Sequence, residues 1–381
     1  YTTLDLHIQQ VARSMASRSL AAIEIAHDLE PKSLESAVVV IDPRTAELRA
    51  LIGSRDAFNV GFNRAINARR SIGSLVKPFV YLAALEQTRR FNLLSRLDDK
   101  PIDLTGADGI VWSPNNYDGK SHGKISLREA LVRSYNLATV DLGLRVGVGQ
   151  VKQRLKKAGF TRKVHDFPSL LLGAIELSPI EVAGLYQAIA NDGYKVPLRA
   201  IRSVADAKHS TLTRYGPRVE KVIEAAPAYL LQHLLTSVVA EGTANAAALA
   251  LPERLPLAGK TGTSNDGRDS WFAGFSGNFL SVIWIGRDDN GKTGLTGASG
   301  ALRLWTALMR QIGATPFRIT QPEGLQFSWV TPTGIAILPA KCRAAVRIPL
   351  ALPHGLPIRR NCDETEERGF DLWGQFRGLF H

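Results

Sequence analysis

One predicted helix limits the fold of this chain more than any other segment. It begins near Ser74, ends before Thr88, and is apolar on nearly every side, with Phe79, Val80, Leu82, Ala83 and Leu85 along it. A helix that is apolar all round is stable only where other elements cover it. We therefore expect this helix at the centre of a domain, opening at one end into a cleft.

The first turn of this helix places a serine and a lysine on one face. Ser74 and Lys77 are three residues apart, so their side chains are neighbours and the amine can take the proton of the hydroxyl. Such a pair is an activated nucleophile that needs no histidine. Gly73 permits a tight entry to the turn. Pro78 removes the donor that would pair with the Ser74 carbonyl, which predicts a local irregularity.

The predicted elements fall into strands at both ends and helices between them. A hairpin is expected over 37–41 and 48–52, an irregular polar region over 92–124, and an antiparallel meander over 259–263, 270–275 and 279–286. Helices are expected over 6–27, from Ser126, from Ser178, over 227–240 and over 301–312. This pattern favours an α+β domain whose single sheet joins the hairpin to the meander.

The charge balance indicates an anionic partner. The chain has 381 residues and a formal net charge of +12, which suits nucleic acid, an anionic membrane surface, or a substrate with free carboxylates. No zinc-finger spacing, RNP motif or basic helix with interleaved aromatics is present, which disfavours nucleic acid. No run reaches the length of a membrane span, and no signal peptide opens the chain.

The only two cysteines, Cys342 and Cys362, lie near the C-terminus. A disulfide between them would stabilise the tail by roughly 3 kcal/mol through the loop it closes, and would suit a periplasmic or extracellular location. Two unrelated reduced thiols are the alternative.

Two later motifs offer further polar groups for the cleft. Ser134-Tyr135-Asn136 ends the helix that starts at Ser126, and Lys260-Thr261-Gly262-Thr263 lies on the first strand of the meander. Taken alone, Ser134 and Asn136 are better explained as a helix-end cap, and Lys260 as part of a solvated strand edge. Copies of the three motifs occur at 121–124, 113–115, 276–278 and 292–294, but these lie in loops or turns where Gly and Asn are expected.

The three motifs in this order, Ser-x-x-Lys, Ser-x-Asn and Lys-Thr-Gly, are those of penicillin-binding proteins and serine β-lactamases. The chain resembles the transpeptidase domain of class A penicillin-binding proteins, closest to the 1B type. The resemblance extends over roughly 36–313 and includes the segments 37–42, 62–65, 70–78, 112–116, 259–263 and 286–290. It implies a central antiparallel sheet flanked by helices, with an inserted all-helical subdomain. We expect an N-terminal helix and linker (1–35), the transpeptidase domain (36–316) and a C-terminal tail (317–381).

The resemblance implies D,D-transpeptidation of peptidoglycan stem peptides and acylation by β-lactams. Ser74 would attack the D-Ala-D-Ala carbonyl with Lys77 as base, and the backbone N–H groups of Ser74 and Thr263 would form the oxyanion hole. Ser134 would relay a proton to the leaving D-alanine, while Asn136 would hold the peptide and orient Lys77. Lys260, Thr261, Gly262 and Thr263 would bind the terminal carboxylate. Burial and the nearby Lys260 would keep Lys77 neutral.

The resemblance implies no cofactor and no metal. The expected partners are donor and acceptor stem peptides, β-lactams and periplasmic cell-wall assembly proteins, with no nucleic acid. It implies a location on the periplasmic side of the bacterial inner membrane, with this fragment soluble and any anchor or glycosyltransferase outside it. A β-lactamase, a D,D-carboxypeptidase and a non-catalytic β-lactam sensor are the alternatives. The first of these lacks support, because no Glu-x-x-Leu-Asn motif lies between the second and third motifs.

Overall fold

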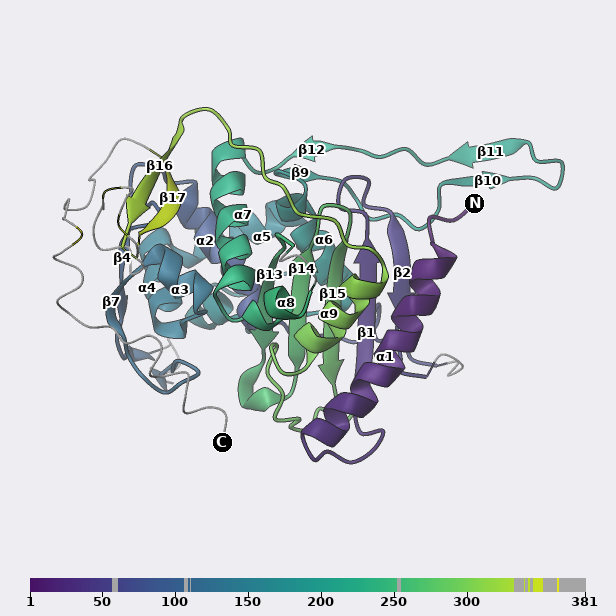
Figure 1. The fold of residues 1–381 in the computed structure, drawn as a ribbon, viewed down its shortest axis with the longest axis horizontal. Helices are drawn as coiled ribbons and strands as arrows, with labels where there is room; N and C mark the ends of the chain where they lie inside the picture. Colours follow the sequence, from purple (N-terminus) through teal and green to yellow (C-terminus); the bar gives the residue numbers. More distant parts are fainter. Residues whose placement is uncertain are drawn as a thin grey trace.

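A five-stranded antiparallel sheet forms the centre of the molecule (Figure 1). The computed structural model describes residues 1–56, 61–105, 109, 111–251, 255–331, 339, 342, 345–351 and 362. The strand order is β13-β14-β15-β1-β2. These strands are β1 (Glu35–Ile41), β2 (Leu48–Ile52), β13 (Ala258–Thr263), β14 (Ser270–Phe275) and β15 (Leu280–Gly286). The predicted hairpin and meander thus join in one sheet, with Val39 opposite Val282, and the predicted fold class is confirmed.

Alternating side chains of the sheet enter two apolar cores. Along β1, Val38 and Val40 belong to the core under α1 (Leu6–Ala26) and α9 (Ala301–Gln311). Val39 and its alternating neighbours belong to the core on the opposite face, which α6 (Pro179–Ala190) covers. Because neighbouring strand residues point to opposite faces, a strand buried on both sides is a continuous apolar run, as β1 is from Ala37 to Ile41.

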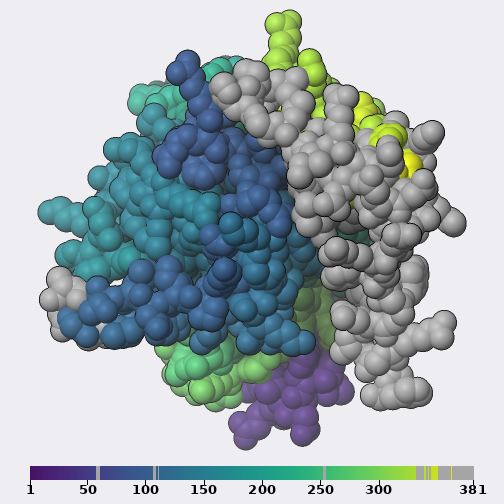
Figure 2. Space-filling view, turned by 90° about the vertical axis from the view of Figure 1, so that its left-hand side faces the viewer, coloured from purple at the N-terminus to yellow at the C-terminus, as the bar shows by residue number. Residues whose placement is uncertain are grey.

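The second core extends into a group of helices beside the sheet. These helices are α2 (Lys77–Leu85), α3 (Leu127–Val132), α4 (Asn136–Val146), α5 (Val148–Ala158) and α7 (Ala225–Ala240), with α8 (Asn245–Ala250) following. Figure 2 shows that residues in blue and teal form much of the surface at this end of the molecule. Every residue of α2 is buried, as the sequence predicts for the central helix.

The entry to α2 differs from the predicted regular helix. Gly73–Val76 forms a 3₁₀ turn, and the α-helix begins only at Lys77. The Ser74 carbonyl accepts a hydrogen bond from the Lys77 N–H. Pro78 therefore lies in the first turn of the α-helix, where a missing N–H costs no internal hydrogen bond. The irregularity expected from Pro78 is this change of helix type.

Two further expectations need correction. The region 92–124 is not wholly irregular, because it contains β4 (Arg96–Asp99), β5 (Leu104–Thr105), β6 (Val111–Trp112) and the start of β7 (Gly123–Ser126). The Ser-x-x-Lys copy at 121–124 runs into β7 and is not helical. Ser134-Tyr135-Asn136 does not simply end a helix, since α3 stops at Val132 and α4 starts at Asn136. The three residues form the junction between two helices.

Short strand pairs and 3₁₀ turns complete the fold. The pairs are β3 (Arg70–Ser71) with β8 (Glu176–Leu177), β4 with β7, β5 with β6, β9 (Tyr194–Lys195) with β12 (Glu220–Lys221), β10 (Ser203–Ala205) with β11 (Thr211–Arg214), and β16 (Leu325–Val330) with β17 (Val346–Ala351). The further turns are η2 (Pro168–Leu172) and η4 (Asn265–Gly267). The hairpin of β10 and β11 projects from the body near the N-terminus (Figure 1). Among the described residues, no helix combines the length and apolar character needed to cross a bilayer.

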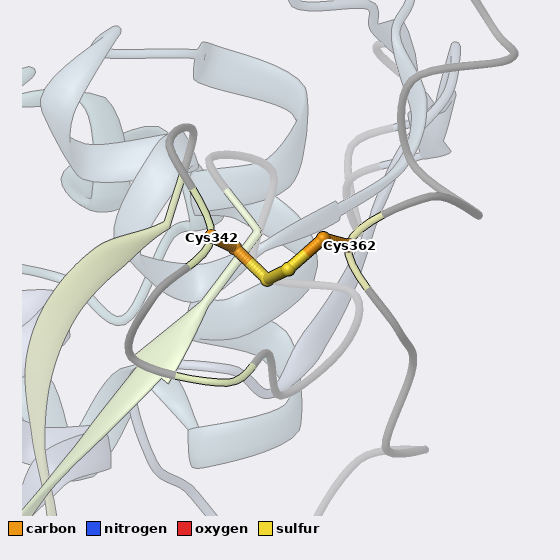
Figure 3. Close-up of a disulfide and its surroundings, with 2 residues drawn as sticks. All are labelled: Cys342 and Cys362. Carbon is orange, nitrogen blue, oxygen red and sulfur yellow. A yellow bond between two sulfur atoms is a disulfide. The ribbon is translucent and has the colours of Figure 1, made fainter.

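The described part of the C-terminal segment packs on the main domain. Phe317, Leu325, Val330, Ile348 and Leu350 are buried and belong to the core on the α2 side of the sheet. Cys342 and Cys362 are joined by a disulfide (Figure 3), which favours the pairing over two free thiols.

Removing this disulfide should lower the thermal stability of the segment. The bond closes a loop with a sequence separation of 20, and its loss costs about 3 kcal/mol on the chain-entropy model. We expect dithiothreitol to lower the unfolding midpoint of the wild type, measured by scanning calorimetry. The double variant Cys342→Ser/Cys362→Ser should unfold at the lower temperature with or without reductant. A wild type that is insensitive to dithiothreitol would contradict this prediction.

Candidate active site

The turn that carries Ser74 packs directly against the end of β13. Gly73 has a φ of +50°, and a Cβ at this position would lie 2.2 Å from the Thr263 carbonyl oxygen. On the strand side, a Cβ at Gly262 would lie 2.9 Å from the Ile72 carbonyl oxygen. Glycine at both positions therefore lets two backbone segments meet without side chains between them. Ser74 is half-buried at this contact.

The Lys77 amine is completely buried and directed at the second motif. Its Nζ donates to the Ser134 carbonyl oxygen at 2.5 Å and to Asn136 Oδ1 at 2.7 Å, and lies 3.3 Å from Ser134 Oγ. A neutral amine has two N–H groups and one lone pair. Because the carbonyl and the amide oxygen only accept, they can take both N–H groups and leave the lone pair for another proton donor.

Burial lowers the pKa of Lys77 well below its usual value. The charge of Lys260 lowers the pKa further, while the carboxylate of Asp99 opposes both effects. The physical cause proposed from the sequence, burial together with Lys260, thus agrees with the surroundings of Lys77. Among the described residues, the Ser74 hydroxyl has no hydrogen bond to another group, so it is available to a substrate and to this amine.

Ser134 lies between the two lysines. Its backbone is left-handed, with a φ of 61°, a conformation that is uncommon outside glycine. This backbone turns the carbonyl toward Lys77, while Ser134 Oγ accepts a hydrogen bond from Lys260 Nζ at 2.8 Å. Ser134 therefore links the first and third motifs through one residue.

Lys260 is as buried as Lys77, and burial lowers its pKa from 10.5 to about 7. The amine also donates to the Thr261 carbonyl oxygen at 3.0 Å. Its positive form is therefore present at neutral pH in a site from which water is largely excluded. Such a cation attracts a carboxylate more strongly than an exposed lysine does.

The free edge of β13 faces the turn with Ser74. The Ser264 N–H donates to the Asp269 carbonyl across the sheet, and hydrogen-bonded pairs alternate along antiparallel strands. The next pair, Thr263 with Ser270, is then not hydrogen-bonded, so the N–H of Thr263 points away from β14. Because β13 is the last strand of its sheet, this N–H points out of the sheet, on the side where the turn with Ser74 lies.

The backbone N–H of Ser74 also has no hydrogen-bond partner among the described residues. It belongs to the second residue of a 3₁₀ turn whose first internal hydrogen bond, from Leu75 to Ile72, comes one residue later. The two N–H groups of Ser74 and Thr263 therefore border the same contact between turn and strand. This arrangement suits a developing oxyanion.

The hydroxyls of the Lys-Thr-Gly-Thr segment contact residues that the sequence did not indicate. Thr261 Oγ1 lies 2.7 Å from Oγ1 of Thr243, in the connection after α7, and Thr263 Oγ1 accepts from the Gly297 N–H at 3.0 Å. Each threonine is thereby held in place, and the Thr263 hydroxyl retains its own proton for donation to a ligand.

A polar network behind Asn136 was also missed from the sequence. The Asn136 N–H donates to Asn116 Oδ1 at 2.6 Å, and Asn136 Nδ2 donates to the Asn115 carbonyl oxygen at 2.6 Å. The Asn116 amide in turn donates to Asp99 Oδ2 at 2.7 Å. Asp99 is fully buried and also lies 2.7 Å from the ring of His122. The segment 112–116 therefore fixes the amide that orients Lys77.

The described residues contain no group of three or more His, Cys, Asp or Glu placed to hold a metal ion. What the site offers is a buried amine, a hydroxyl nucleophile, a second hydroxyl and a second cation. These groups suit acyl transfer to and from a serine.

The family model described as the penicillin binding protein transpeptidase domain matches residues 36–278. Penicillin-binding protein 1B of Vibrio cholerae is 44% identical over 305 residues, which cover 80% of this chain and 38% of that protein. Penicillin-binding protein 1B of Escherichia coli is 39% identical over 349 residues, 89% of this chain and 41% of that protein. The chain thus spans about two fifths of the length of these relatives.

Solved structures share the fold at lower identity. Penicillin-binding protein 1A from Haemophilus influenzae aligns with a TM-score of 0.78 at 23% identity, over 87% of this chain and 55% of that chain. The PonA1 protein from Mycobacterium tuberculosis, in complex with penicillin V, aligns with a TM-score of 0.70 at 24% identity, over 84% of this chain and 88% of that chain. By fold and by sequence, the chain belongs to the penicillin-binding protein transpeptidase domain family.

Proposed function

We propose that this chain is a D,D-transpeptidase domain that cross-links peptidoglycan stem peptides through an acyl-enzyme on Ser74. The observation that carries the proposal is the surroundings of Lys77. Its buried amine donates to two acceptor-only oxygens and has a strongly lowered pKa. This is the state that a general base for a serine hydroxyl requires.

In the first half of the reaction, Lys77 takes the Ser74 proton as Oγ attacks the penultimate D-alanine carbonyl. The backbone N–H groups of Ser74 and Thr263 stabilise the oxyanion of the tetrahedral intermediate. Ser134, which accepts a hydrogen bond from Lys260, passes a proton to the leaving D-alanine nitrogen. Asn136 holds the donor backbone and keeps Lys77 oriented.

The donor's terminal carboxylate binds beside Lys260. Thr261 and Thr263 supply hydroxyls, and Gly262 allows close approach to the strand. In the second half, the amine of another stem peptide attacks the Ser74 ester, and the bond between the acyl carbon and Ser74 Oγ breaks. Lys77 accepts the amine proton and returns it to Ser74 Oγ. A β-lactam acylates the same serine, but its leaving amine stays attached to the acyl group through the opened ring. No group departs, so no space is left for an acceptor.

The family of the relatives supports a proposal about partners and location. We propose that donor and acceptor stem peptides are the substrates, and that the chain acts on the periplasmic side of the inner membrane with cell-wall assembly proteins. The disulfide between Cys342 and Cys362 supports an oxidising compartment.

Replacing the base should abolish acylation while the fold is retained. Because general base catalysis contributes about 10²–10⁴-fold, Lys77→Ala should form the penicillin adduct at least 10²-fold more slowly. Intact-mass spectrometry over time measures the adduct, with Ser74→Ala as the unreactive control and circular dichroism as the check on folding. Labelling of Lys77→Ala at the wild-type rate would refute the role of the base. Rapid loss of the wild-type adduct would indicate a β-lactamase instead.

The pH dependence of kcat/KM for a D-Ala-D-Ala donor should be bell-shaped. Lys77 must be neutral, so the rate rises with pH through its lowered pKa. Lys260 must be protonated to bind the carboxylate, so the rate falls as pH rises through its pKa of about 7. A donor with an amidated C-terminus should lack the alkaline limb. If the amidated donor keeps that limb, Lys260 is not its cause.

Asp99 should act on Lys77 in two separable ways. Its carboxylate raises the pKa of Lys77, so Asp99→Asn should move the acidic limb of the penicillin acylation rate to lower pH. The Asn116 side-chain amide and the His122 backbone N–H both donate to Asp99 Oδ2, and in the variant they would face an N–H donor instead. This should loosen Asn136 and reduce the maximal rate by about 10-fold. Stopped-flow acylation between pH 5 and 9 measures both effects. If neither the position of the acidic limb nor the maximal rate changes, the hydrogen-bond network around Asp99 does not contribute to catalysis.

A further inference from the structure

His122 contacts two parts of the active site at once, and the mechanism above gives its ring no role. The ring Nδ1 lies 2.7 Å from Asp99 Oδ2. The ring also stacks on Tyr135, with the ring centroids 4.0 Å apart and the planes at 20°. Tyr135 is the residue between Ser134 and Asn136, whose oxygens hold the amine of the proposed base. One imidazole therefore joins the buried carboxylate to the junction that carries the second motif.

The hydrogen bond to Asp99 fixes which ring nitrogen carries a proton. A carboxylate only accepts hydrogen bonds, so His122 Nδ1 must be the donor. The backbone N–H of His122 donates to the same Oδ2 at 2.9 Å, and the Asn116 amide donates to it at 2.7 Å. The other oxygen accepts from the Ala138 N–H at 3.0 Å. Because Asp99 is fully buried, each of these donors replaces water that the carboxylate has lost.

The Nδ1–H group also affects how strongly Asp99 acts on Lys77. Burial and the charge of Lys260 lower the pKa of Lys77, and the Asp99 carboxylate opposes both effects. The positive end of the Nδ1–H bond faces this carboxylate and offsets part of its field at the amine. A ring that donates to Asp99 therefore favours the neutral form of Lys77.

The stack on Tyr135 acts on the geometry of the same amine. Ser134 has a φ of 61° and offers its carbonyl oxygen to Lys77 Nζ in this left-handed conformation. Such a backbone is uncommon outside glycine, so surrounding contacts must hold it in place. Rotation of Ser134 to an ordinary conformation would turn the next residue, Tyr135, and move its ring away from His122. The stack therefore favours the conformation that orients Lys77.

Other titratable groups also face this ring. Asp118 Oδ2 lies 3.1 Å from His122 Nε2, and the Asp118 side chain is partly exposed. On α3, burial raises the pKa of Glu129, and His122 is among the groups that oppose this shift. Burial raises the pKa of Tyr135 to about 12, so its phenol stays neutral at the pH of an enzyme assay. A change in the pH profile on replacing His122 therefore does not come from the phenol.

We propose that His122 is a positioning residue for the proposed general base. Its Nδ1–H limits the effect of the Asp99 charge on Lys77, and its ring holds Tyr135 and thereby the Ser134 carbonyl. The proposal rests on the proposed transpeptidase function, because it explains how the base of that reaction is kept neutral and oriented.

Two substitutions separate the two contacts. In His122→Phe a ring remains for the stack but the donor to Asp99 is lost, so the acidic limb of the penicillin acylation rate should move to higher pH. This direction is opposite to the one expected for Asp99→Asn. In His122→Asn the amide Nδ2 takes the place of Nδ1 and keeps the donor, while the ring is lost. Its limb should move less than that of His122→Phe, and its maximal rate should fall by about 2- to 10-fold, as for one aromatic pair.

Tyr135→Leu removes the same stack from the other side and should lower the maximal rate as His122→Asn does. The double variant His122→Asn/Tyr135→Leu should be no slower than the slower single variant, because residues that act through one contact are not additive. His165→Phe is the matched control. His165 is an exposed loop histidine whose ring lies 5.5 Å from that of Phe167, and its replacement should change neither the limb nor the rate.

Stopped-flow acylation over the pH range used for Asp99→Asn measures both quantities, and circular dichroism checks the folding of each variant. An acidic limb that stays in place or moves to lower pH in His122→Phe would overturn the proposal. An unchanged maximal rate in His122→Asn would do the same, as would a double variant whose losses add. If His122→Phe does not fold, the additivity of the His122→Asn and Tyr135→Leu losses decides the proposal without it. A wild type that forms no penicillin adduct would instead refute the proposed function.

Discussion

The burial of the Lys77 amine is the constraint on which the site depends. A lysine amine that is buried away from water favours its neutral form unless an anion lies beside it. The Lys77 N–H groups instead donate to two neutral oxygens, the Ser134 carbonyl and Asn136 Oδ1. Ser134 can offer its carbonyl only because the chain adopts a left-handed conformation between α3 and α4. The strain at this junction, typically about 1–3 kcal/mol, is offset by the packing of the helices around α2.

At the turn that carries Ser74, the sheet and the helical part of the domain approach each other backbone to backbone. Gly73 lies against the Thr263 carbonyl, Gly262 against Ile72, and a Cβ at Gly173 would lie 2.0 Å from the Gly73 carbonyl oxygen. Side chains at such a junction would add rotamer freedom and separate the segments. Three glycines instead fix the distance between the two N–H groups of Ser74 and Thr263, so an oxyanion would meet donors that need no rearrangement.

Local patterns in the sequence were sufficient to predict the five strands of the central sheet, the joining of the hairpin and the meander in one sheet, and the buried helix with Ser74 and Lys77. They failed where an effect depends on a contact between distant segments. The 3₁₀ turn at Gly73 follows from its close contact with Thr263, 190 positions along the chain. Asp99, Asn116 and Thr243 act through side-chain hydrogen bonds between loops, which leave no periodic signal. Only the family-like segment 112–116 indicated that this loop had a role.

The distribution of cations around the site follows their proton chemistry. A lysine gives up its proton when buried, whereas an arginine remains charged in any protein environment. Lys77 and Lys260 occupy the dry interior, where one amine must accept a proton and the other has a pKa of about 7. Arg69, Arg70 and Arg268 line a pocket beside them, where each guanidinium keeps its charge. The formal charge of +12 therefore counts two lysines whose charged form burial disfavours, together with neighbouring arginines that stay charged.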